Sequence, residues 1–312
     1  MDRNWHLGVS VTSIFLDSPG GSLLPAMAQA GRAEVDYLSI ADHVSFRGGV
    51  GVDGLLNAAA LLSVQDRLPV TVGVFLLALR HPVLAARHLV DLDRIAPGRL
   101  TLAVGVGGED RHELEVCGVD PARRGRRTDE ALEVLRPLLA GEEVTHRGEH
   151  FAFDAARLLP AVSRPPQILV GGRSEAALRR VARLGDGWQA MWTSPRRFAT
   201  ATAELAELAA AAGRTTNFRH GLTVFVAVDP DARRARSQLE TFIGQRYGMP
   251  LEKVERWCAA GTATDVAEFL HGYLEVGCTS FTIVAATDDV PDALQQAEHV
   301  REALLDHTGK GI

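Results

Sequence analysis

The chain alternates between short runs rich in β-branched and other apolar residues and longer stretches rich in alanine and leucine. The short runs end in small or polar residues, as buried strands of a parallel sheet do. The longer stretches place apolar residues at helical spacing. The pattern therefore predicts a series of strand-then-helix units along the whole chain.

We expect strands at 6–11, 36–41, 69–75, 99–104, 167–170, 187–192, 221–228 and 279–284. Helices are expected at 22–30, 53–65, 82–93, 121–139, 174–184, 195–212, 230–247, 264–275 and 290–305. Strands that alternate with helices predict a parallel sheet. Eight units without a linker favour a closed (β/α)8 TIM barrel over an open doubly wound sheet, in one domain over 1–312.

Two segments depart from the alternation and predict insertions into the barrel. Residues 142–154 alternate around Arg147-Gly148 and indicate a small hairpin. Residues about 247–262 are expected to form a helical insertion.

Composition narrows the possible functions. Apolar residues make up 46% of 312 residues and charged residues 23%, typical of a globular domain rather than a disordered chain. The net charge of −6 argues against a nucleic-acid surface. No apolar run reaches the length of a membrane span, and the N-terminus lacks a signal-peptide core, so we expect a cytoplasmic protein. Cys117, Cys258 and Cys278 are scattered and predict neither disulfides nor a thiolate metal site.

Candidate chemistry lies after the strands, because active sites of such barrels occupy the C-terminal strand ends. Gly171-Gly172-Arg173-Ser174 opens a helix and either binds a phosphate on free amides or is simply a capped turn. The glycine-rich turn after strand four, Gly105 to Gly108, lacks the third glycine of a dinucleotide fingerprint. Asp42-His43 is the best acid–base candidate, since histidine titrates near neutrality. The alternative is a capping aspartate beside a surface histidine.

Other polar clusters indicate no metal site. His146 and His150 fall in the predicted hairpin, and His112-Glu113 lacks the second histidine of the HExxH motif. Trp192 follows strand six and either lines a pocket or packs in the core.

Four segments together resemble the bacterial luciferase-like flavin and deazaflavin oxidoreductase superfamily over nearly the whole chain. They are "SIADHV" at 39–44, residues 70–110, "RGRRTDEALEVLRPLLAGEEVTHRGEHF" at 124–151 and "PPQILVGGRSEAALRRVARLGDGW" at 165–188. The resemblance implies a (β/α)8 barrel with insertions at the C-terminal face that binds FMN or the deazaflavin coenzyme F420. The Asp-His pair after strand two is similar to the F420-dependent branch.

The resemblance also implies roles for individual residues. His43, held by Asp42 or the backbone, serves the proton chemistry beside the deazaflavin ring, and a non-prolyl cis peptide is implied at Gly73-Val74. The cofactor phosphate is implied near Gly171, Gly172 and Arg173, and the ring and tail near Gly105, Gly107 and Gly108. Glu109 matches the acidic residue that follows the strand-four glycines in the sugar-phosphate dehydrogenase members only if this chain has one residue inserted there. Thr193 and Arg196 stand where sugar-phosphate members hold a substrate phosphate, with Trp192 beside them, but the family lysine is arginine here.

Three hypotheses follow. The first is an F420-dependent oxidoreductase that transfers a hydride between the deazaflavin and a small organic substrate. The second is an FMN-dependent two-component monooxygenase that uses reduced flavin and O2. The third is a carrier of the cofactor without catalysis. The resemblance implies a homodimer, and a flavin or F420 reductase would supply the reduced cofactor.

Overall fold

The computed structural model describes residues 3–17, 22–215 and 217–309. Eight parallel strands close into a barrel in the order β1-β2-β5-β6-β9-β10-β11-β13, and β13 pairs back with β1. The strands are β1 (His6–Ser10), β2 (Tyr37–Ile40), β5 (Val70–Leu76), β6 (Leu100–Gly105), β9 (Gln167–Gly171), β10 (Gly187–Met191), β11 (Gly221–Val228) and β13 (Ser280–Ala285). The predicted (β/α)8 barrel is confirmed, and each strand end lies within one residue of its expected position.

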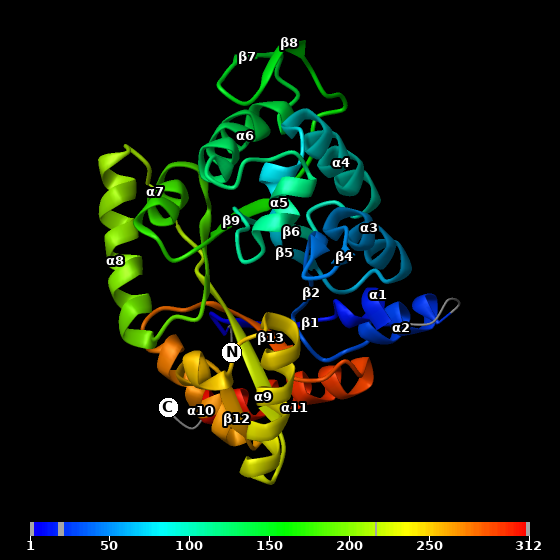
Figure 1. Cartoon of the computed structure of the whole chain (residues 1–312), viewed down its shortest axis with the longest axis vertical. Coiled ribbons are helices and arrows are strands. Elements are labelled where there is room, and N and C mark those ends of the chain that lie inside the picture. The colour runs from blue at the N-terminus through cyan, green and yellow to red at the C-terminus, as the bar shows by residue number, and fades with distance from the viewer. Residues whose placement is uncertain (1–2, 18–21, 216, 310–312) are drawn as a thin grey trace.

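Helices surround the barrel, as Figure 1 shows. They are α2 (Leu23–Ala30), α3 (Gly54–Val64), α4 (Pro82–Ile95), α6 (Arg124–Leu139), α7 (Glu175–Leu184), α8 (Pro195–Ala211), α9 (Ala232–Tyr247), α10 (Ala263–Leu274) and α11 (Val290–Gly309). Their apolar faces pack on strands that are themselves apolar, so that Leu7, Leu38, Val70 and Phe281 are wholly buried. Burial on both sides explains why the strand runs are continuously apolar in the sequence. Every helix in these ranges is too short or too polar to cross a bilayer.

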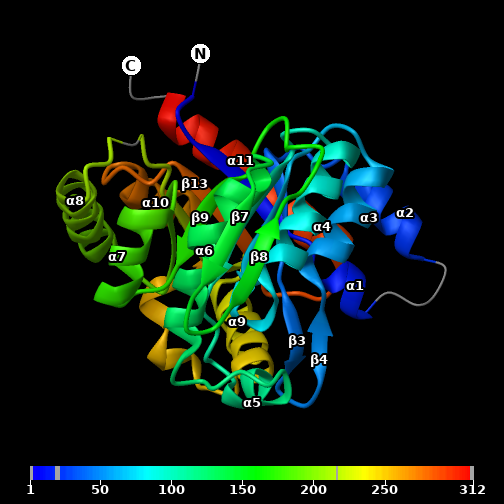
Figure 2. The same ribbon diagram turned by 90° about the horizontal axis from the view of Figure 1, so that it is seen from above.

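The structure adds elements that the alternation does not predict. A short helix α1 (Ser13–Asp17) follows β1, an antiparallel hairpin of β3 (His43–Phe46) and β4 (Val50–Val52) follows β2, and α5 (Arg111–Val116) follows β6. Figure 2 shows the β3–β4 hairpin, α5 and α9 gathered at one end of the barrel. These elements are therefore placed to form the walls of a site at the strand ends.

The two expected insertions have different structures. Strands β7 (Val144–Arg147) and β8 (Ala152–Ala156) pair as an antiparallel hairpin. This hairpin lies beside α6 in Figure 1. The segment after α9 holds two single-turn 3-10 helices, Leu251–Lys253 and Glu255–Trp257, and then β12 (Ala259–Gly261). β12 adds to β11 as a ninth parallel strand outside the closed ring.

Candidate functional site

A cavity of about 440 Å³ lies at the C-terminal ends of the barrel strands. Every barrel strand contributes to its lining: Ser10, Ser39, Gly73, Gly105, Gly171, Gln189, Thr223 and Thr282. The walls continue upward into the loops and into the β3–β4 hairpin, α5 and α9. Concave sites of this size and place are where barrel enzymes bind small molecules.

One wall of the cavity is built from β5, β6 and β9 and carries little side-chain bulk. The Gly73–Val74 peptide bond is cis, as the family resemblance implies. A β-carbon added at Gly105 would lie 2.5 Å from Cγ2 of Val74, and one at Gly171 would lie 3.1 Å from its Cγ1. Glycine is therefore required at Gly105 for the strands to pack against Val74, and we call Gly73, Val74, Gly105 and Gly171 the glycine wall.

Two glycine turns border this wall. Gly172 has a φ of +120° and leads into α7, whose N-cap Ser174 accepts a hydrogen bond from the amide of Ala177. Gly107 and Gly108 have φ values of +67° and +112° after β6. Together with Arg173, all three glycines line the cavity.

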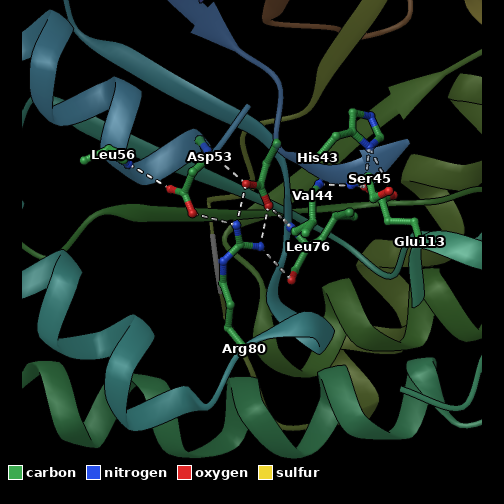
Figure 3. Close-up of polar contacts among 10 residues, drawn as sticks. His43, Val44, Ser45, Asp53, Leu56, Leu76, Arg80 and Glu113 are labelled. Carbon is green, nitrogen blue, oxygen red and sulfur yellow. Dashed lines mark hydrogen bonds and ion pairs between the residues drawn. The ribbon is translucent and has the colours of Figure 1, made fainter. Parts of the chain in front are cut away.

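His43 lines the cavity from the start of β3, and its ring is held by Glu113 of α5. The imidazole Nδ1 lies 3.1 Å from Oε2 of Glu113, whose side chain is 4% exposed. Oε1 of the same carboxylate accepts hydrogen bonds from the amides of Val44 (2.7 Å) and Ser45 (3.2 Å), as Figure 3 shows. Burial acts to raise the pKa of Glu113, but the hydrogen bonds from His43 and the two amides outweigh it and lower that pKa. Glu113 is therefore an ionised acceptor, Nδ1 donates to it, and Nε2 is left for the cavity.

Asp42 does not serve as the partner of His43, which corrects the expectation from the sequence. Its buried carboxylate accepts two bonds of 2.7 Å from the Arg80 guanidinium and further bonds from the amides of Gly54 and Leu76. Asp42 therefore ties the end of β2 to the start of α3 and to the end of β5. Asp42 lies outside the cavity lining and, through these bonds, fixes the end of the strand that precedes His43.

Glu109 also lines the cavity, on the loop after β6. Burial raises the pKa of its carboxyl, while the nearby side chains of His43, Arg47 and Arg173 oppose the rise. Glu109 is thus a second titratable group near His43.

A family model for luciferase-like monooxygenases matches residues 19–268. The chain belongs to this family. An uncharacterized protein of Mycobacterium tuberculosis is 34% identical over 167 residues, which cover 54% of this chain and 57% of the relative. The match thus spans little more than half the length of this curated relative.

Two solved structures illustrate the fold of the luciferase-like family. An F420-dependent secondary alcohol dehydrogenase, solved with an F420-acetone adduct, has a TM-score of 0.84 and 19% identity, covering 96% of this chain and 99% of its own. The FMN complex of the oxygenating constituent of 3,6-diketocamphane monooxygenase from Pseudomonas putida has a TM-score of 0.78 and 17% identity, covering 96% and 97%. At these identities the likeness shows the shared barrel, and the luciferase-like fold serves both cofactors.

The luciferase-like chain places its expected substrate residues differently. Trp192 lines the cavity. Thr193 is 3% exposed, with its hydroxyl bonded to the carbonyl of Met191 and its own carbonyl accepting from the Tyr273 hydroxyl. Neither Thr193 nor Arg196 belongs to the cavity lining. The phosphate-binding role implied for these two residues is therefore not supported by their position.

The sequence analysis missed several residues of the site. The sequence analysis treats Glu113 only as part of an incomplete metal motif, and the signal available is its place in the first turn of α5, the helix that follows β6. Arg47, Phe225, Phe242 and Tyr247 also line the cavity. Nothing in the local pattern marks Arg47, Phe242 and Tyr247, because the β3–β4 hairpin and α9 bring them over the barrel only in the folded chain. Phe225 lies on β11, where it is one of several buried apolar residues.

Proposed function

We propose that this chain is an F420-dependent oxidoreductase that transfers a hydride between the deazaflavin and a small organic substrate. The observation that carries the proposal is the His43–Glu113 pair at the same cavity as the glycine wall. A carrier has no need of an oriented, carboxylate-paired histidine, so the pair favours catalysis over the carrier hypothesis.

The residues present fit a cofactor with a planar ring and an anionic group. In the glycine wall, Val74 packs directly against the backbone of Gly105 and Gly171, so that Val74 is the one side chain larger than hydrogen on this wall. At the start of α7, the backbone amides and Arg173 form the combination that binds phosphate at helix N-termini. We propose that the ring lies on the glycine wall and that Gly172 and Arg173 hold the phosphate, with Gly107 and Gly108 beside the ring and tail.

When bound, the deazaflavin supplies hydride transfer, which moves two electrons and one hydrogen to or from a substrate carbon. Nε2 of His43 supplies the accompanying proton to the substrate oxygen during reduction and takes it back during oxidation. Glu113 keeps the ring oriented through the bond to Nδ1. Glu109 adds a second proton-holding group at the cavity edge.

The second candidate is an FMN-dependent two-component monooxygenase, favoured by the likeness to the FMN-bound structure above. The same glycine wall would hold the flavin ring, and a partner reductase would supply reduced FMN. In either case we expect a homodimer. Oxygen uptake with reduced FMN would favour this candidate, because reduced flavin reacts readily with oxygen and reduced deazaflavin does not.

The test of the proposed role is His43→Ala. We expect the variant to bind F420 within about twofold of the parent, because the substitution leaves the glycine wall and the α7 turn intact. Turnover should fall about 10²- to 10⁴-fold, the usual contribution of a positioned acid–base group. Full turnover by the variant would overturn the role of His43.

A further inference from the structure

The cavity lining includes arginines that differ in what they contact. Arg246 pairs with Asp288. Within the described part of the chain, neither Arg47 nor Arg173 forms an ion pair. Their guanidinium groups lie over aromatic rings instead, that of Arg47 at 5.5 Å from the Phe46 ring centre and that of Arg173 at 5.8 Å from the Trp192 ring centre. Arg47 and Arg173 therefore bring two positive charges to the cavity without a directly bonded carboxylate among the described residues.

Arg47 stands at the tip of the β3–β4 hairpin, in a turn that favours glycine. Its φ is +35°, a left-handed conformation that residues with a side chain seldom adopt, and Gly48 and Gly49 follow with φ values of +89° and +96°. The amide of Arg47 donates a hydrogen bond of 2.7 Å to Oδ2 of Asp110, which holds the turn against the start of α5. An arginine kept where glycine would be less strained indicates a use for its side chain.

The Arg47 side chain reaches from the hairpin to the end of α9. A β-carbon added at Gly248, the residue that follows α9, would lie 2.9 Å from Nη1 of Arg47. The Phe46 ring that Arg47 contacts also contacts His43, with the two ring centres 4.3 Å apart. The guanidinium is therefore one aromatic ring away from the proposed proton donor, whereas Arg173 lies at the α7 turn.

Glu109 lies near both of these arginines. Burial raises the pKa of its carboxyl and outweighs His43, Arg47 and Arg173, which act to lower that pKa. A raised pKa favours the neutral carboxyl, so Glu109 balances less of the positive charge than an ordinary carboxylate would. The part of the cavity next to His43 is therefore suited to a ligand that carries a negative charge.

We propose that Arg47 binds a carboxylate of the substrate and that the substrates are oxo acids and the corresponding hydroxy acids. The substrate class rests on the proposed function above. A guanidinium binds a carboxylate through two parallel hydrogen bonds, and a molecule held in this way by Arg47 extends toward His43. Reduction then adds the hydride to the carbonyl carbon and the proton from Nε2 of His43 to the carbonyl oxygen, which yields the hydroxy acid and oxidised F420.

The experiment is a ligand-observed NMR titration of the protein without cofactor, which measures the dissociation constants of two matched probes. 4-Oxopentanoate carries a carbonyl and a carboxylate, and 4-oxopentanamide has the same shape without the charge. We expect the acid to bind at least about tenfold more tightly than the amide, because only the acid forms a charge-assisted pair with Arg47. Failure of the acid to bind, or equal binding of the amide, would overturn the proposal.

Three variants locate the binding. Arg47→Gln removes the charge and should weaken 4-oxopentanoate at least about tenfold while leaving the amide unchanged, and Arg47→Lys should restore part of the loss. Arg196→Gln is the matched control, since it removes the same charge from α8 outside the cavity lining and should change neither constant. If Arg47 only stabilises the end of α9, Arg47→Gln will lower the urea midpoint and leave binding of the acid unaltered, a result that refutes the proposal.

F420 binding, measured separately, shows whether the substrate or the cofactor supplies the carboxylate, because the F420 tail also carries anionic groups. We expect Arg47→Gln to bind F420 within about twofold of the parent, since the α7 turn is intact. A loss of F420 affinity of about tenfold or more with unaltered binding of 4-oxopentanoate would assign Arg47 to the cofactor and overturn the proposal.

The same measurements separate this proposal from the proposed function. If F420 fails to bind but 4-oxopentanoate binds and Arg47→Gln removes it, the carboxylate site stands and the proposed function falls. If F420 binds and the protein reduces the amide better than the acid, the oxo-acid class falls and the proposed function stands.

Discussion

The carboxylate of Glu113 holds the start of the β3–β4 hairpin as well as the His43 ring, so its removal has a calculable effect. Glu113→Ala leaves the amides of Val44 and Ser45 and Nδ1 of His43 without their acceptor. An unsatisfied group of this kind costs about 1–3 kcal/mol when buried and less where water replaces the partner. Because these contacts are partly buried, we expect the free energy of unfolding to fall by about 2–4 kcal/mol.

Glu113→Gln separates the acceptor from the charge. The amide oxygen can still accept from Val44 and Ser45, both of which bond to Oε1, so stability at pH 7 should fall by only about 1 kcal/mol. Urea unfolding of the parent and both variants measures the difference. A loss below about 0.5 kcal/mol for Glu113→Ala would refute the reasoning.

The lowered pKa of Glu113 predicts a pH dependence for the same comparison. A carboxyl whose pKa is lower in the folded state than in the unfolded chain stabilises the fold above the unfolded value of 4.5, and this stabilisation is lost as pH falls through the folded value. The stability gap between the parent and Glu113→Gln should therefore close below pH 4.5. A gap that persists into strong acid contradicts the assignment.

The tautomer of His43 provides a readout that does not depend on stability. In the parent, the neutral ring should carry its hydrogen on Nδ1, which faces the carboxylate. In Glu113→Gln the side-chain amide can donate instead, and the hydrogen should move to Nε2. Nitrogen NMR of the labelled ring distinguishes these states, and the same tautomer in both proteins would contradict the positioning role.

Three further predictions concern other parts of the fold. Burial lowers the pKa of His220 to about 4, so the folded protein holds this ring neutral near pH 6. The free energy of unfolding should therefore fall by up to about 3 kcal/mol as pH drops from 6.5 to 4, and urea unfolding of His220→Gln should show no such fall. Gly105→Ala places a methyl against Val74 and should destabilise the barrel by about 1–3 kcal/mol in the same assay; an unchanged midpoint would contradict the close approach. Arg80→Met leaves Asp42 buried without its cation and should lower the free energy of unfolding by about 3–5 kcal/mol, whereas a neutral effect would show that Asp42 is not held as a charged group.

The barrel could be predicted because its strands are buried on both faces. Such strands are continuously apolar and short, and proline or glycine marks where they meet the helices, so the local pattern carries their limits. The β3–β4 hairpin carries no such signal, since Val44 and Val50 are exposed and the strands are three to four residues long.

The candidate site was predictable in part. The order of strands and helices in the sequence already places several glycines at the ends of barrel strands. The glycines of the glycine wall and of the α7 turn all line the cavity. The partner of His43 was not predictable, because Glu113 is 70 positions away and α5 reaches it only in the folded chain. Asp42, adjacent in sequence, turns its carboxylate to Arg80 instead.

The most direct test of the central proposal is a binding titration of the purified protein with F420 and FMN in parallel, each oxidised and reduced. We predict F420 binding with a dissociation constant of about 1 μM or tighter and FMN binding at least about tenfold weaker. Tighter binding of FMN, accompanied by oxygen consumption with reduced FMN, would contradict the proposal and assign the chain to flavin monooxygenase chemistry.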